Sequence, residues 1–151
     1  MRYLLNTTVL VYLSEAKPDL PGRVDCHTIS EVASELSFIV GESEASAVLE
    51  GVSIVDAVKT KSKGEERWLS TADIQLAAAA KSSGFVLVSD DKKLLSAAKQ
   101  NKTKCLDTPH FIESLTGKIE KSEALEILAR LKPVYLRKKL LESVEKRIRS
   151  W

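Results

Sequence analysis

The sequence predicts an α/β fold in which a parallel sheet of about five strands lies between layers of helices, a three-layer α/β/α arrangement. Two observations support this prediction. Short aliphatic and β-branched segments alternate with helical patterns over residues 2–106, which is typical of parallel sheets covered by helices. The clearest apolar run, FVLVS at 85–89, directly follows Gly84 at the end of a strongly helical pattern.

Five short apolar segments are expected to form the strands. They are RYLLN at 2–6, VDCHTI at 24–29, VSIVD at 52–56, FVLVS at 85–89 and, with the weakest pattern, TKCL at 103–106. The segments between and just beyond them are predicted to be helices, at 8–15, 30–40, 42–50, 71–83 and 92–101. Segment 71–83 is the best defined, because Ser70 can cap its start and Gly84 follows its end.

After Pro109 the pattern is helical only. Three further helices are predicted, at 109–115, 121–131 and 134–149. We therefore expect an α/β domain over residues 1–116. A basic helical extension over residues 117–151 should pack on this domain or flank it.

Composition argues against several classes of protein. No apolar run approaches the ~20 residues that cross a bilayer, and the N-terminal run stops at Asn6 with no cleavage pattern behind it, so no membrane partner is expected. Cys26 and Cys105 are too few and too isolated for a disulfide framework or a zinc site. A reducing, cytoplasmic location is the expectation.

The net charge of +2 conceals an asymmetry along the chain. Residues 130–151 contain eight Lys or Arg and two Glu, a net charge of +6, which leaves residues 1–129 with −4. A basic end on an acidic body indicates a polyanionic partner beside a site for cations. A solvated helix face is the simpler explanation of the basic run taken alone.

Polar residues gather where the predicted strands end. In a parallel sheet the carboxyl ends of the strands form one edge, and ligands bind beyond it. The residues expected there are Asn6, Glu31, Glu35, Asp73, Asp90 and Asp91. Clustered carboxylates repel one another unless a cation joins them. Oxygen ligands without Cys or His favour a hard divalent ion, Mg²⁺ or Mn²⁺, which can activate water against a phosphodiester.

Helix capping is the competing explanation for several of these acids. Thr28 and Glu31 match a capping box, as do Ser70 and Asp73 in its Asp form. Asp90 is placed to cap the helix that begins near residue 92. Glu35 lies a full turn inside its helix, where capping does not explain it.

Four motifs in order resemble the PIN-domain nuclease family over about residues 1–115. They are YLLNTTVL, TISEVASEL, STADIQLAAAAKSSG and VLVSDDKKLLSAA. The pattern is similar to the archaeal and eukaryotic PIN endonuclease of small-subunit rRNA maturation, and the compact size is similar to VapC toxins. The resemblance implies a hydrolase, an Mg²⁺- or Mn²⁺-dependent endonuclease that cleaves single-stranded RNA. It also implies a ribosomal or antitoxin partner.

The resemblance places the catalytic and metal-binding positions on Asn6, Glu35, Asp73 and Asp91, with Asp90 as the alternative to Asp91. Two departures from the family pattern stand out. Asn6 is an amide where the family has an acid, which should weaken metal binding, and the zinc ribbon of the rRNA-maturation enzyme is absent from this sequence. A catalytically inert PIN-fold module for RNA binding or ribosome assembly is therefore the alternative function.

Basic side chains near the predicted site are the candidates for RNA binding. They are Lys92 and Lys93 beside Asp91, and Lys61, Lys63 and Arg67 in the loop before Asp73. The consecutive Arg137, Lys138 and Lys139 would fan around a helix and give general electrostatic help. The apolar spacing of ALEILARL at 124–131 also allows packing on a partner or a second copy of the chain.

Overall fold

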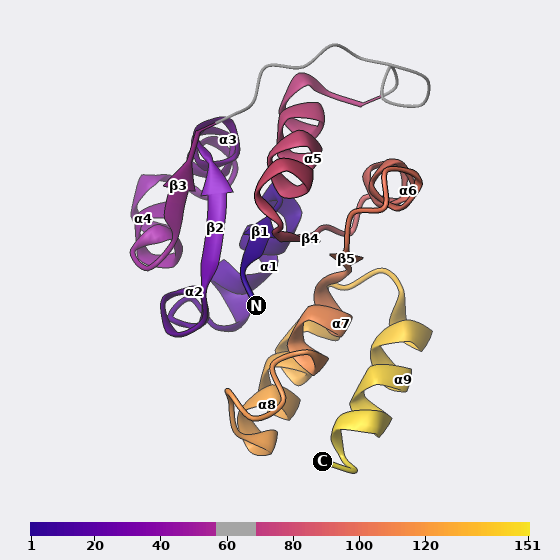
Figure 1. Cartoon of the computed structure of the whole chain (residues 1–151). Helices are drawn as coiled ribbons and strands as arrows, with labels where there is room; N and C mark the ends of the chain where they lie inside the picture. The colour runs from indigo at the N-terminus through magenta and orange to yellow at the C-terminus, as the bar shows by residue number, and fades with distance from the viewer. Residues whose placement is uncertain (57–68) are drawn as a thin grey trace.

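A computed structural model describes residues 1–56 and 69–151 of the chain. Its centre is a five-stranded parallel sheet with the strand order β3-β2-β1-β4-β5 (Figure 1). The strands are β1 (Tyr3–Leu5), β2 (Cys26–Ile29), β3 (Ser53–Val55), β4 (Val86–Val88) and β5 (Cys105–Leu106). The α/β class and the parallel sheet are confirmed, and each strand lies within the segment predicted for it.

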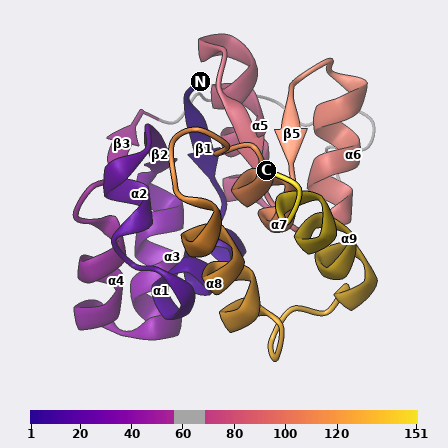
Figure 2. The same cartoon turned by 90° about the horizontal axis from the view of Figure 1, so that it is seen from below.

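Nine helices accompany the sheet in the described part of the chain. They are α1 (Thr7–Ala16), α2 (Leu20–Arg23), α3 (Ser30–Val40), α4 (Glu42–Leu49), α5 (Thr71–Ser83), α6 (Lys92–Gln100), α7 (Thr108–Glu113), α8 (Lys121–Leu131) and α9 (Lys138–Ile148). Helices α1, α3 and α4 pack together on one side of the strands, while α5 packs on β4 and against α6 on the other (Figure 2). The arrangement is consistent with three layers.

The central strands are completely enclosed. Tyr3, Leu4 and Leu5 of β1 are fully buried, which is expected of a strand covered by helices on both faces. The C-terminal helices share this core, because Ile127 and Leu128 of α8 belong to the same buried cluster. Helix α8 packs on α1, so residues 117–151 lie against the α/β body and not apart from it.

Two helices of the structure differ from the prediction. Helix α2 was not predicted, because it is a single turn that begins with Leu-Pro-Gly. The last helix begins at Lys138 and not at residue 134, since Pro133 and the residues after it form turns and bends. Tyr135 and Arg137 are therefore off the helix, and Arg137 does not fan around it as predicted.

Capping follows the sequence in one case and departs from it in two. Ser70 Oγ accepts the backbone N–H of Asp73, and Gly84 ends α5 with a φ of 70°, as predicted. The Thr28–Glu31 capping box is wrong, because the Thr28 hydroxyl donates to the carbonyl of Leu5. Asp91, not Asp90, caps α6.

Within the described residues, none of the helices combines the length and the hydrophobicity that a bilayer-spanning segment needs.

Candidate functional site

Asn6 joins the end of β1 to the start of α1. Its backbone N–H donates to Val88 O of β4, and its side-chain Oδ1 accepts the N–H of Thr7 at 2.8 Å. Its Nδ2 donates to Ser89 Oγ at 2.9 Å. Asn6 is 7% exposed, so both side-chain atoms of this buried amide are used inside the protein.

Ser89 and Asp91 follow the neighbouring strand β4. Ser89 Oγ also accepts the N–H of Asp91 at 3.1 Å, so this buried oxygen bridges Asn6 to Asp91. Asp91 Oδ1 accepts the N–H groups of Lys93 and Leu94 and thereby caps α6. Since Leu5 pairs with Val88 in the sheet, Asn6 and Ser89 begin at the same level of the carboxyl edge.

Glu35 reaches this edge from α3. Its Oε2 accepts the Thr7 hydroxyl at 3.0 Å, which connects the acid to the residue directly after Asn6. Glu31, one turn earlier on α3, is hydrogen-bonded to Ser30 and makes no such contact. Glu31 and Glu35 therefore lie on the same helix, but only Glu35 contacts Thr7.

Asp73 enters from the first turn of α5 and is half-buried. Burial raises the pKa of its carboxyl group, and the charges of Asp91 and Glu35 raise the pKa further, while hydrogen bonds from Ser70 lower it. The negative charges of Asp91 and Glu35 therefore both act on Asp73. That Asn6, Glu35, Asp73 and Asp91 together hold a metal ion stays a prediction.

Asp73, Asp91 and Glu35 nevertheless do not form a preformed metal site. Among residues 1–56 and 69–151, no three His, Cys, Asp or Glu side chains are arranged closely enough to hold a metal ion together. Asn6 is an amide and does not belong to any of these residue types. The structure therefore shows a loose acidic edge with oxygen donors only.

Asp90 is engaged elsewhere. Its carboxylate accepts the backbone N–H and the hydroxyl of Thr108, at the start of α7, and the Tyr135 hydroxyl at 2.6 Å. Arg137 Nη2 lies 3.7 Å from the same carboxylate. These partners tie β4, α7 and the C-terminal segment together. Asp90 thus has a structural role, and its place as the alternative ligand to Asp91 stays a prediction.

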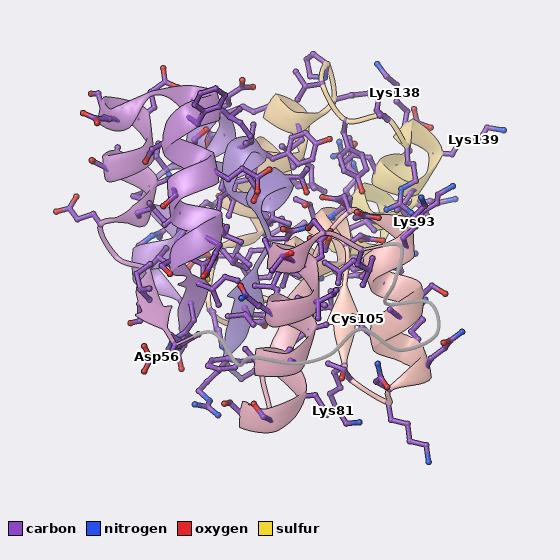
Figure 3. All side chains as sticks on the ribbon, turned by 90° about the horizontal axis from the view of Figure 1, so that it is seen from above. Asp56, Lys81, Lys93, Cys105, Lys138 and Lys139 are labelled. Carbon is purple, nitrogen blue, oxygen red and sulfur yellow. The ribbon has the colours of Figure 1, made fainter. Side chains whose placement is uncertain are left out.

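The predicted RNA-binding residues divide into two groups. Lys92 and Lys93 are exposed in the first turn of α6, directly after Asp91, and Lys93 lies on the face seen in Figure 3. Lys61, Lys63 and Arg67 lie outside the described residues. Figure 3 also shows Lys139 projecting outward at the rim of the molecule.

Sequence reasoning missed the contribution of the C-terminal segment and of α1. A pocket of about 390 Å³ adjoins Asp91 and Lys92, and Tyr12 and Tyr135 line it together with Leu136 and Arg137. The aromatic residues at positions 12 and 135 were the available signal. It is weak, because a tyrosine is more often a core residue than a binding residue.

The basic character of the C-terminal segment is partly internal. Arg130 pairs with Glu126, Arg147 with Glu113 and Arg149 with Glu145. Arg137 lies near Asp90 and Asp107. Half of the eight basic side chains in residues 130–151 therefore face acids of the same chain. This pairing reduces the charge that the segment can offer to a polyanion.

Comparisons with protein-family models, curated proteins and solved structures give no match to this chain.

Proposed function

We propose that the chain is a PIN-type, metal-dependent endoribonuclease of single-stranded RNA, weakened by Asn6. The observation that supports the proposal is the coupling of Asp73 to Asp91 and Glu35 at the carboxyl edge of the sheet. The charges of Asp91 and Glu35 make the ionised form of Asp73 less stable, and a bound cation would relieve that cost.

The donor set fits Mg²⁺ or Mn²⁺ in its chemistry. Every candidate donor is an oxygen, and Mg²⁺ is usually held by one or two carboxylates, with water and substrate phosphate completing its shell. Asp73, Asp91 and Glu35 would hold the ion, with the carbonyl oxygen of Asn6 beside them. Such an ion supplies an activated water and stabilises the leaving oxygen of a phosphodiester.

Asn6 explains why the activity should be low. Its amide brings no negative charge, and its Oδ1 already accepts the N–H of Thr7. Ser89, which accepts from the Asn6 amide, keeps the site ordered without adding charge. The predicted consequence is weak metal affinity.

Lys92 and Lys93 support an RNA substrate. Cations in the first turn of a helix face the positive end of its dipole, so they do not stabilise the helix there. Their position is better explained by contact with phosphate groups that approach Asp91. A ribosomal or antitoxin partner and a homodimer remain predictions from the sequence.

A catalytically inert RNA-binding module is the second candidate. The observation that favours it is that both terminal atoms of the Asn6 side chain already make hydrogen bonds within the protein. In that case the fold would retain RNA affinity while the acids serve as caps.

The test is cleavage of a labelled single-stranded RNA with Mn²⁺ by the chain, by Asn6→Asp, and by Asn6→Asp combined with Asp73→Asn. The nuclease proposal expects slow cleavage by the chain, faster cleavage by Asn6→Asp, and loss of cleavage in the double variant or with a chelator. Cleavage by none of them, or cleavage that survives Asp73→Asn, overturns the nuclease proposal.

RNA binding is measured separately, by fluorescence anisotropy in a chelator. Replacing Lys92 and Lys93 with Gln should weaken binding and make the affinity less sensitive to salt, by about one released ion for each phosphate that is no longer bound. Lys81→Gln is the matched control, because Lys81 is exposed in the last turn of α5, at the other end of that helix from Asp73. Equal effects at both places would contradict the proposed RNA face.

A further inference from the structure

The pocket beside Asp91 is built from three parts of the chain. Helix α1 contributes Thr8 and Tyr12, and the segment from the end of β4 to the start of α6 contributes Asp90, Asp91 and Lys92. The segment before α9 contributes Tyr135, Leu136 and Arg137. Its volume, about 390 Å³, is in the range of pockets that enclose small organic groups. The C-terminal segment thus forms a wall of the candidate site.

The apolar surfaces of the pocket are suited to a flat ring. The Tyr12 and Tyr135 rings lie 5.5 Å apart between centroids and are inclined by 59°. Tyr135 is buried, so Tyr12, which is partly exposed, offers the aromatic surface. Leu136 is 90% exposed and lines the pocket, so its side chain is accessible to a ligand there.

The charged groups of the pocket are two cations and two acids. Lys92 and Arg137 are its cations. Asp90 also lines the pocket, and Arg137 Nη2 lies 3.7 Å from its carboxylate and 3.7 Å from that of Asp107. The Asp90 carboxylate accepts hydrogen bonds from Thr108 and Tyr135, while no acid is paired with Lys92 among the described residues. Asp91 accepts hydrogen bonds from the N–H groups of Lys93 and Leu94 in the first turn of α6, beside the proposed metal site.

We propose that this pocket binds one nucleotide of the RNA strand, with its base against Tyr12 and Leu136 and its phosphate near Lys92 and Arg137. The inference rests on the proposed function only in taking RNA as the ligand. It assigns the C-terminal segment a part in holding the substrate next to Asp91. An aromatic or apolar surface that stacks on a base, paired with cations for the phosphate, is the usual way of holding single strands.

The test is binding of a fluorescent single-stranded RNA in a chelator, so that no cleavage is needed. Tyr12→Ala should weaken binding by about fivefold or more, the range found when a stacking residue is removed. Arg137→Gln and Leu136→Ala should each weaken binding more than their controls, Lys139→Gln and Val134→Ala. The controls remove the same kind of group from exposed positions nearby that do not line the pocket. Circular dichroism and thermal unfolding establish that each variant is folded.

Cross-linking gives an independent readout on the unaltered chain. Photoactivated 4-thiouridine RNA should join to peptides that contain Tyr12 or Tyr135–Arg137. Cross-links found only at other peptides, or pocket variants that bind like their controls, overturn the inference. Displacement of the RNA by free mononucleotide at equal concentration would assign the pocket to a free nucleotide and also overturn it.

The result is separable from the nuclease test. Binding through the pocket without any metal-dependent cleavage would defeat the proposed nuclease and leave the nucleotide pocket standing. Cleavage by Asn6→Asp with no effect of the pocket variants on binding would do the reverse.

Discussion

Asn6 Nδ2 donates a hydrogen bond of 2.9 Å to Ser89 Oγ, which joins the ends of the adjacent strands β1 and β4. The same oxygen accepts the N–H of Asp91, so Ser89 accepts two hydrogen bonds in a buried position. The first and last candidate ligands are therefore positioned through one hydroxyl group. Because the amide nitrogen of Asn6 can only donate, Ser89 Oγ is the acceptor of this hydrogen bond.

The first prediction concerns this hydroxyl. Ser89→Ala leaves the Asn6 amide and the Asp91 N–H without their acceptor, and a buried donor left unsatisfied costs about 1–3 kcal/mol. We expect a loss of that size in the free energy of unfolding, measured with urea. Ser34→Ala, at an exposed position of α3, is the control and should change stability by less than about 0.5 kcal/mol. Equal losses in both variants would contradict the bridging role.

The second prediction concerns the pH dependence that Asp73 brings. Burial and the charges of Asp91 and Glu35 raise the pKa of Asp73 in the folded chain above the ordinary value, about 3.9. Between the two values the folded state binds more protons than the unfolded state. The stabilising contribution of Asp73 is therefore fully present below its pKa in the unfolded chain. It is lost as the pH rises through the pKa of Asp73 in the folded chain.

Asp73→Asn removes this dependence. In a chelator, its free energy of unfolding relative to the unaltered chain should rise as the pH increases from about 4 towards neutrality. Asp56→Asn serves as the control, because Asp56 is exposed and lies at the rim of the molecule in Figure 3. A relative stability of Asp73→Asn that stays constant over this range would refute the coupling.

The third prediction concerns the anchor of the C-terminal segment. The Tyr135 hydroxyl donates to the Asp90 carboxylate at 2.6 Å, and a hydrogen bond to a charged group contributes about 1.5–3 kcal/mol. Tyr135→Phe should lose about that much stability in urea unfolding. Tyr12→Phe is the matched control, since no hydrogen bond of the Tyr12 hydroxyl is found among the described residues, and it should be nearly neutral. A loss in Tyr12→Phe as large as that in Tyr135→Phe would show that the anchor is misassigned.

The sheet was predictable because its strands have a local signature. Strands β1 and β4 are short buried runs, and burial on both faces produces the continuous apolar pattern seen in FVLVS. Helix α5 was predictable for the same reason, since Ser70 and Gly84 mark its ends. Helix α2 has only one turn and leaves no periodic pattern.

The candidate site was predictable only in part. The rule that ligands lie at the carboxyl ends of parallel strands selected six residues, and only the resemblance in sequence motifs narrowed them to Asn6, Glu35, Asp73 and Asp91. It could not separate Asp90 from Asp91, because adjacent residues at a strand end point in different directions. That difference depends on Thr108 and Tyr135, which are distant in sequence. The pocket wall at Tyr135–Arg137 depends on the same long-range contacts.

The last prediction concerns the charge missing at position 6. Asn6→Asp adds a carboxylate beside Asp73, Asp91 and Glu35, so without divalent ions the variant should unfold at a lower temperature than the unaltered chain. The capping bond to Thr7 N–H can persist, because either side chain offers an acceptor oxygen there. Mn²⁺ should then stabilise the variant more than the unaltered chain.

Linkage sets the expected size of this effect. An ion present at a hundredfold excess over its dissociation constant stabilises the folded state by about 2.7 kcal/mol. For a chain of this length, each kcal/mol raises the unfolding temperature by about 2–4 °C. Thermal unfolding of Asn6→Asp with and without Mn²⁺ measures this stabilisation. The control is Gln100→Glu, which adds a negative charge at the exposed end of α6. If Mn²⁺ shifts both variants equally, the added charge at residue 6 does not complete a metal site, because a general effect of negative charge explains the shift.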